Sequence, residues 1–82
     1  MGTSKEDIKR WLKQGKKEKA THVIVVCDTF DYEDYPVYVM KNEDVHKVYD
    51  EHNGKNMQRV MEVYNLSKDI DEQLNTRRAF NF

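Results

Sequence analysis

The run THVIVVC at residues 21–27 constrains the fold more than any other part of the sequence. Successive side chains of a strand point to opposite faces, so the run can be divided into two alternating sets. Both sets are apolar: Val23, Val25 and Cys27 on one face, Ile24 and Val26 on the other. β-Branched residues favour strands, and a strand that is apolar on both faces is covered on both sides. The run therefore predicts an interior strand.

A helix is predicted before this strand. Thr3 or Ser4 can cap its start, and acidic residues follow in the first turn. Gly15 lies on the apolar side and either ends the helix or lets it approach a sheet closely. The apolar residues at helical spacing are Ile8, Trp11 and Leu12. We expect this stripe, Trp11 included, to pack into the core.

Two further strands are predicted. The run PVYVM at residues 36–40 is typical of a strand that has Pro36 at its start. Residues 58–65 are rich in Val and Tyr and follow the break at Gly54, which favours a strand there. The apolar spacing of residues 57–66 also fits a helix, so both alternatives stay open for that segment.

Two more helices complete the prediction. Asn42 is a good N-cap for a helix that Asn53 and Gly54 would stop. Ser67 is expected to cap a last short helix that runs to about Leu74.

Together these elements predict a single domain, residues 1–82, of the α+β class. The element order is helix, strand, strand, helix, strand, helix, and we expect a small three-stranded sheet with helices packed on it. The first two strands should pair antiparallel. The helix between the second and third strands permits either a right-handed crossover or a third strand placed beside the first.

The segment between the first two strands carries the most distinctive chemistry. Four acids and three aromatic residues fill the loop predicted at residues 28–35. Aromatic rings supply large contact area at low entropic cost, and acids steer a basic partner toward the surface. The alternative is that one or two rings fold back onto the sheet. The predicted partner-binding residues are Asp28, Phe30, Asp31, Tyr32, Glu33, Asp34 and Tyr35.

Charge is unevenly spread along the chain. Residues 1–19 carry seven basic and three acidic side chains, whereas residues 28–52 carry two basic and eight acidic ones. Such a distribution predicts a dipolar molecule suited to charge-steered association, including head-to-tail self-association. The acidic middle segment does not suit general nucleic-acid binding, because phosphate contacts need positive charge.

No metal, cofactor or catalytic motif is recognisable. The acids of the loop lack the ligand spacing of an EF-hand, and His22, His46 and His52 share no ligand spacing. Cys27 is the single cysteine, and its place in an apolar strand predicts a buried thiol with no activating group. We therefore expect a non-enzymatic protein without metal or cofactor. One cysteine and no apolar run long enough for a membrane span point to the reducing cytoplasm.

Two alternatives to a protein-binding role remain open. A homo-oligomer could sequester a small nucleotide between its subunits, or the chain could be a purely structural oligomerisation module. An assembly larger than a monomer is expected, since the core is small and Phe80 and Phe82 need cover. The residues expected to face the nucleotide phosphates are Lys55, Arg59, Arg77 and Arg78.

The segments ATHVIVVCDTFDYEDYPVYVM and GKNMQRVMEVYNLSKDIDEQLN, followed by RRAF, resemble small proteins encoded in phage and prophage genomes. The resemblance covers most of the chain, rests on overall pattern and carries no catalytic residue. It implies a protein that acts by binding, either by blocking a host protein or by sequestering a nucleotide signal of host defence. The leading hypothesis is a phage accessory protein or anti-defence inhibitor that acts through the acidic-aromatic loop.

Overall fold

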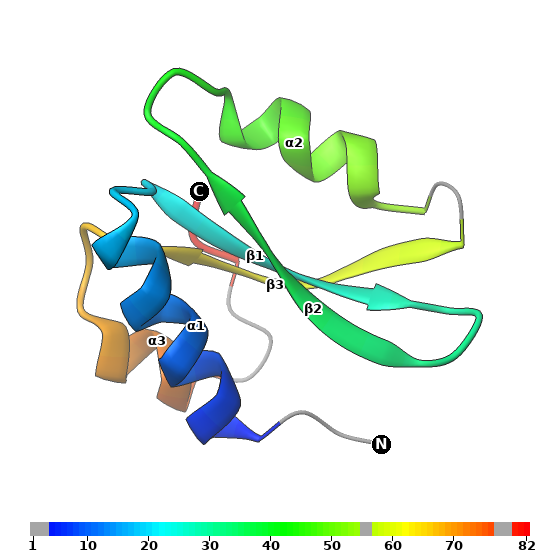
Figure 1. The fold of residues 1–82 in the computed structure, drawn as a ribbon, viewed down its shortest axis with the longest axis horizontal. Coiled ribbons are helices and arrows are strands. Elements are labelled where there is room, and N and C mark those ends of the chain that lie inside the picture. Colours follow the sequence, from blue (N-terminus) through cyan, green and yellow to red (C-terminus); the bar gives the residue numbers. More distant parts are fainter. Residues whose placement is uncertain (1–3, 55–56, 77–79) are drawn as a thin grey trace.

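A computed structural model describes residues 4–54, 57–76 and 80–82 of the chain. It has the element order that the sequence predicts, and helices cover both faces of a three-stranded sheet (Figure 1). The predicted α+β class is confirmed. The elements are α1 (Lys5–Lys17), β1 (His22–Asp28), β2 (Glu33–Val39), α2 (Val45–His52), β3 (Gln58–Asn65) and α3 (Ile70–Asn75).

The central strand of the sheet is β1, with β2 and β3 on its two sides. Both neighbours run antiparallel to β1, and Ile24 lies opposite Val37 of β2 and Val63 of β3. The third strand is thus placed beside the first, and the segment at residues 58–65 is a strand as predicted. The pairing of β1 with β3 shifts by one residue between Val25 and Val26, where the ladder has an irregularity.

Two apolar clusters lie on opposite faces of the sheet, as the two-sided β1 predicts. Helices α1 and α3 cover one face and α2 covers the other (Figure 1). The first cluster contains Ile8, Leu12, Ala20, Val23, Val25, Tyr64 and Leu66, with Trp11 packed against it. The second contains Ile24, Val26, Val39, Val48, Val60 and Val63.

Gly15 lets α1 approach the sheet closely, and the helix continues past it to Lys17. A Cβ atom at Gly15 would lie 2.9 Å from Val23 Cγ2, closer than unstrained packing allows. The start of α1 is a capping box, in which Ser4 and Asp7 satisfy each other's backbone N–H groups.

Three predicted boundaries are wrong. β2 begins at Glu33, not at residue 36, so Pro36 lies in mid-strand opposite Val25. Proline is tolerated there because β2 is an edge strand within the sheet. The antiparallel pairing of β1 with β2 continues through the polar residues before Pro36, up to the point where the chain reverses direction. The loop between β1 and β2 is therefore residues 29–32, shorter than the predicted 28–35.

The other two errors concern helix caps. Asp44, not Asn42, caps α2 and accepts a hydrogen bond from the His46 N–H at 2.9 Å. Asp69, not Ser67, caps α3, because the Ser67 hydroxyl is used in a turn and donates to Asn65 Oδ1. In both cases an Asp lies closer to the first helical turn than the predicted cap does.

The segment at residues 80–82 lies along the outer edge of β3. Phe80 forms a parallel bridge with Val63, and the Asn81 N–H donates to the Val63 carbonyl at 2.9 Å. The Phe82 ring stacks on His46 of α2, with 4.4 Å between ring centroids. Both phenylalanines thus gain partial cover within the chain, but 39% of Phe80 and 38% of Phe82 stay exposed, so the expectation of an assembly stays a prediction.

Candidate binding surface

The hairpin turn at residues 29–32 is closed by its own acids. The Tyr32 N–H donates to the Asp28 carbonyl at 2.7 Å. The Asp28 carboxylate accepts from the Phe30 N–H at 2.8 Å, and the Asp31 carboxylate accepts from the Glu33 N–H at 3.1 Å. These side-chain bonds are local turn bonds of the kind that Asp favours. Two of the four acids therefore also shape the turn.

The hairpin turn is also tied to β3. The Thr29 N–H and the Thr29 hydroxyl both donate to the Met57 carbonyl, at 2.7 and 2.8 Å. Two bonds from one residue link the turn to the residue before β3, so neighbouring strands support each other at this end of the sheet. These hydrogen bonds therefore brace the backbone that carries Phe30, between Thr29 and Asp31, and Tyr32, which follows Asp31.

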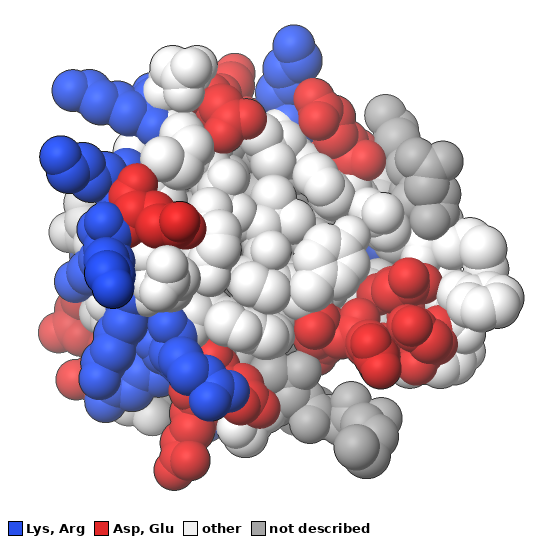
Figure 2. All heavy atoms as spheres, viewed as in Figure 1, with Lys and Arg blue, Asp and Glu red and all other residues white. Residues whose placement is uncertain are grey.

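The apolar side chains of this end of the sheet face solvent. The exposed fraction is 76% for Phe30, 67% for Tyr32 and 58% for Met57. Tyr32 also adopts a positive φ of 58°, which is uncommon for a residue with a large side chain. A group of acidic side chains lies beside the β1–β2 turn, and basic side chains gather on the opposite side, over α1 (Figure 2).

The structure brings together part of the predicted site. Asp28, Phe30, Asp31 and Tyr32 lie at the tip of the hairpin, next to the exposed Glu33. Tyr35 instead packs against the cluster under α2, and burial, followed by the nearby Asp28 carboxylate, raises the pKa of its hydroxyl. Folding back onto the sheet, which was the alternative for the aromatic residues, thus applies to Tyr35.

Asp34 is separated from the tip because it points to the α1 side of the sheet. There it lies in register with Cys27 of β1, which in turn lies opposite Arg59 of β3. Burial, followed by the neighbouring Asp34 side chain, raises the pKa of the Cys27 thiol, whose Sγ lies 3.7 Å from the Asp28 carbonyl oxygen. A thiol held in its protonated form is a poor nucleophile, in keeping with the expectation from the sequence.

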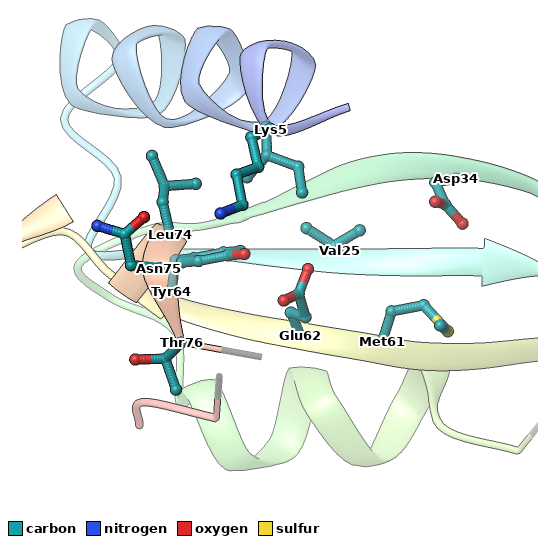
Figure 3. A pocket seen from close by; sticks show the side chains of 10 residues that line it. Lys5, Val25, Asp34, Met61, Glu62, Tyr64, Leu74, Asn75 and Thr76 are labelled. Carbon is teal, nitrogen blue, oxygen red and sulfur yellow. The ribbon is translucent and has the colours of Figure 1, made fainter. Parts of the chain in front are cut away.

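A cavity of about 380 Å³ opens on the same side of the sheet (Figure 3). Side chains from α1, all three strands and the end of α3 surround it. They are Lys5, Ile8, Val25, Asp34, Met61, Glu62, Tyr64, Leu74, Asn75 and Thr76. Sequence reasoning missed this cavity, although one signal was present: Glu62 is the only acid within the otherwise apolar run VMEVY.

The residues predicted for a nucleotide site are mostly outside the described part of the chain. Lys55, Arg77 and Arg78 fall there, and only Arg59 can be placed. Arg59 is exposed on β3 and its guanidinium lies 3.6 Å from Met61 Sδ. Among its described lining residues, the cavity to which Met61 belongs includes Lys5, Asp34 and Glu62.

Two other kinds of site are absent from residues 4–54, 57–76 and 80–82. No group of three or more His, Cys, Asp or Glu side chains there is arranged to hold a metal ion. None of the helices in those ranges has the length and apolar character needed to cross a membrane.

Comparisons with known proteins bring no relative. No family model, no curated protein and no solved structure matches the chain.

Proposed function

We propose that this protein is a non-enzymatic binding protein that engages a basic surface of a partner protein through the tip of its β1–β2 hairpin. The binding surface consists of Asp28, Phe30, Asp31, Tyr32 and Glu33. The rings supply the contact area and the carboxylates supply attraction to the partner.

The single observation that carries the proposal is the exposure of two large aromatic side chains on a braced turn. Phe30 and Tyr32 are 76% and 67% exposed, although hydrogen bonds of Asp28, Thr29 and Asp31 hold the backbone beneath them. Exposed aromatic side chains on a preformed backbone lose little entropy on binding, which favours their use as anchors. Neither ion pair within the described ranges involves an acid of the hairpin. The Asp28 and Asp31 carboxylates accept hydrogen bonds of the turn, and the side chains of Asp31 and Glu33 are exposed.

The test is selection of a random peptide library against the immobilised protein. We expect the enriched peptides to be rich in Lys and Arg. Tyr32→Gly should weaken their binding by roughly 1–3 kcal/mol, as for an aromatic anchor. Glycine suits the positive φ at this position, so the variant should fold as stably as the parent within about 0.5 kcal/mol.

A pair of charge variants distinguishes attraction by the acids of the hairpin turn from attraction by the overall negative charge of the protein. Asp31→Asn with Glu33→Gln should slow association and flatten its salt dependence, and the amide oxygen introduced at position 31 can still close the turn. The matched control is Asp50→Asn with Glu51→Gln, which removes two exposed acids from α2. Enriched peptides without excess basic residues, or equal binding by Tyr32→Gly, would refute the proposed function.

The biological setting implied by the resemblance is a phage accessory or anti-defence role in the cytoplasm of a host, and it stays a prediction. A nucleotide sponge and a structural oligomerisation module also stay predictions. Among the described residues, no observation favours either of them over the hairpin surface.

A further inference from the structure

The three residues from Phe80 to Phe82 lie on the outer edge of β3 in the manner of a bound peptide. Phe80 bridges to Val63 in parallel orientation, and the Asn81 N–H donates to the Val63 carbonyl at 2.9 Å. The Asn65 side-chain amide donates to the Phe82 carbonyl at 3.4 Å. An extended segment that adds to the edge of a sheet through backbone hydrogen bonds is a common mode of peptide recognition.

The two rings of this segment contact α2. Phe82 stacks on the His46 ring with 4.4 Å between centroids, and it meets the Tyr49 ring edge-on at 5.2 Å. Phe80 meets the same Tyr49 ring edge-on at 6.4 Å. Alternate side chains of an extended segment share one side, so α2 favours an aromatic residue at each of two positions separated by one residue. The edge site is defined by His46, Tyr49, Val63 and Asn65.

A cavity of about 390 Å³ lies on the other side of the same segment. Asn81, which alternation places opposite the two rings, contributes to its lining. The volume is at the lower end of the range for ligand pockets, and a longer side chain can reach further into it than Asn81 does. The polar side chains that line it from α3 and its flanks are Lys68, Asp69, Glu72, Gln73 and Thr76.

The cover that this segment gives to β3 is partial, in contrast to the neighbouring cover by α3. The exposed fractions are 39% for Phe80 and 38% for Phe82. Gln73, which bonds both backbone groups of Asn65, is only 4% exposed. Partly exposed rings lose less apolar contact on leaving than buried side chains do. The edge beside Val63 is therefore the part of β3 that a partner can open most easily.

We propose that the edge site is a peptide-binding site, which residues 80–82 occupy within the chain and which an extended segment of another protein occupies in their place. The partner segment carries two aromatic side chains separated by one residue, and both rings lie on α2. The residue between them has a longer polar side chain that enters the cavity beside α3. The edge site is separate from the hairpin surface, and its occupation does not depend on the proposed function.

The probe is the peptide acetyl-Ala-Phe-Gln-Phe-amide, titrated into the isotopically labelled full chain and followed by NMR. Phe80→Ser with Phe82→Ser removes the internal competitor. We expect the peptide to shift the Val63 backbone amide and the Asn65 side-chain amide. It should bind this variant about tenfold more tightly than the parent, in which a tethered segment of roughly millimolar effective concentration competes. Acetyl-Phe-Phe-Ala-Gln-amide, with the same composition but adjacent rings, should leave these signals in place.

A second variant weakens the internal competitor but keeps both rings. Asn81→Pro has no N–H to donate to the Val63 carbonyl, so the peptide should bind it more tightly than the parent. His46→Ala, added to the double serine variant, should weaken the peptide about threefold because one aromatic contact is lost. The exposed Lys47→Ala is the matched control and should change nothing. Glycine in place of the peptide's Gln should weaken binding about threefold, as for one net hydrogen bond.

The outcomes test the two parts of the edge site separately. Equal binding by the parent and both competitor variants, shifts outside the edge site, or binding of the adjacent-ring peptide would overturn it. Asn81→Pro decides alone if the double serine variant does not fold. Equal affinity of the Gln and Gly peptides would overturn the assignment of the cavity to the middle side chain. None of these outcomes changes the test of the hairpin surface, which depends on Tyr32.

Discussion

Single residues determine how tightly α1 packs on the sheet, and Gly15 is the sharpest case. In an exposed helix a Gly→Ala change stabilises by about 1 kcal/mol. Here the added Cβ would lie 2.9 Å from Val23 Cγ2 and 3.2 Å from Leu66 Cδ1. Overpacking of this kind costs roughly 1–3 kcal/mol. We therefore expect Gly15→Ala to lower the free energy of unfolding by about 1 kcal/mol, measured by urea denaturation.

The neighbouring Gln14 supplies the control for this experiment. It is exposed on the same helix, so Gln14→Ala should leave stability unchanged or raise it slightly. A Gly15→Ala variant that is as stable as Gln14→Ala would show that α1 can move away from the sheet at little cost.

At the same scale, His22 links stability to pH. Its Nδ1 lies 2.9 Å from Thr21 Oγ1, and its Nε2 is buried without a hydrogen-bond partner among the described residues. Burial lowers the pKa of His22 below its ordinary value of 6.5, and nearby His46 and Lys68 lower it further. The unfolded chain then binds more protons than the folded one below about pH 7.5, so stability falls on acidification toward the folded pKa.

We expect His22→Gln to reduce this loss. The measurement compares melting temperatures at about pH 7.5 and about pH 5.5, a window that spans the unfolded pKa. Lys68→Gln should act in the same direction, because removing a nearby cation raises the pKa of His22 toward the unfolded value. An acid-induced drop in melting temperature that His22→Gln leaves unchanged would contradict this assignment.

At the scale of elements, the attachment of α3 to β3 depends on one buried polar side chain. Gln73 is 4% exposed, and its side-chain amide bonds both backbone groups of Asn65, accepting at 2.7 Å and donating at 2.9 Å. Gln73→Leu would leave those groups without their partner, at a cost of roughly 1–3 kcal/mol. Urea denaturation should show this loss, whereas the exposed Glu72→Gln should be close to neutral. Equal stability of both variants would mean that water replaces the amide.

At the scale of the whole molecule, the separation of charge favours association. Basic side chains gather over α1 and acidic ones beside the hairpin turn, at the opposite end (Figure 2). We expect head-to-tail assemblies at about 100 µM protein in about 20 mM salt, and their dissociation in about 500 mM salt, where charges are screened. Light scattering measures the mass. Lys13→Gln with Lys17→Gln should weaken assembly, and a monomer mass at low salt would exclude it.

The sequence by itself determined the two-sided core and five of the six elements in their order, and it favoured a strand at residues 58–65 while leaving a helix open there. Those features depend on local signals: the β-branched run at residues 21–27, the helical stripes and the breaks at Gly54 and in the hairpin. The sequence located the helix starts less well, because Asn, Asp and Ser are all competent N-caps. Only the path of the backbone selects Asp44 over Asn42 for α2 and Asp69 over Ser67 for α3.

Only the tertiary structure decided which residues share a surface. The predicted loop places seven residues together, but strand pairing from Glu33 onward sends Asp34 and Tyr35 to opposite faces, because side chains alternate along a strand. The cavity brings Lys5, Asp34 and Glu62 together from three separate elements. Their proximity depends on sheet register and on the packing of α1, which no local pattern encodes.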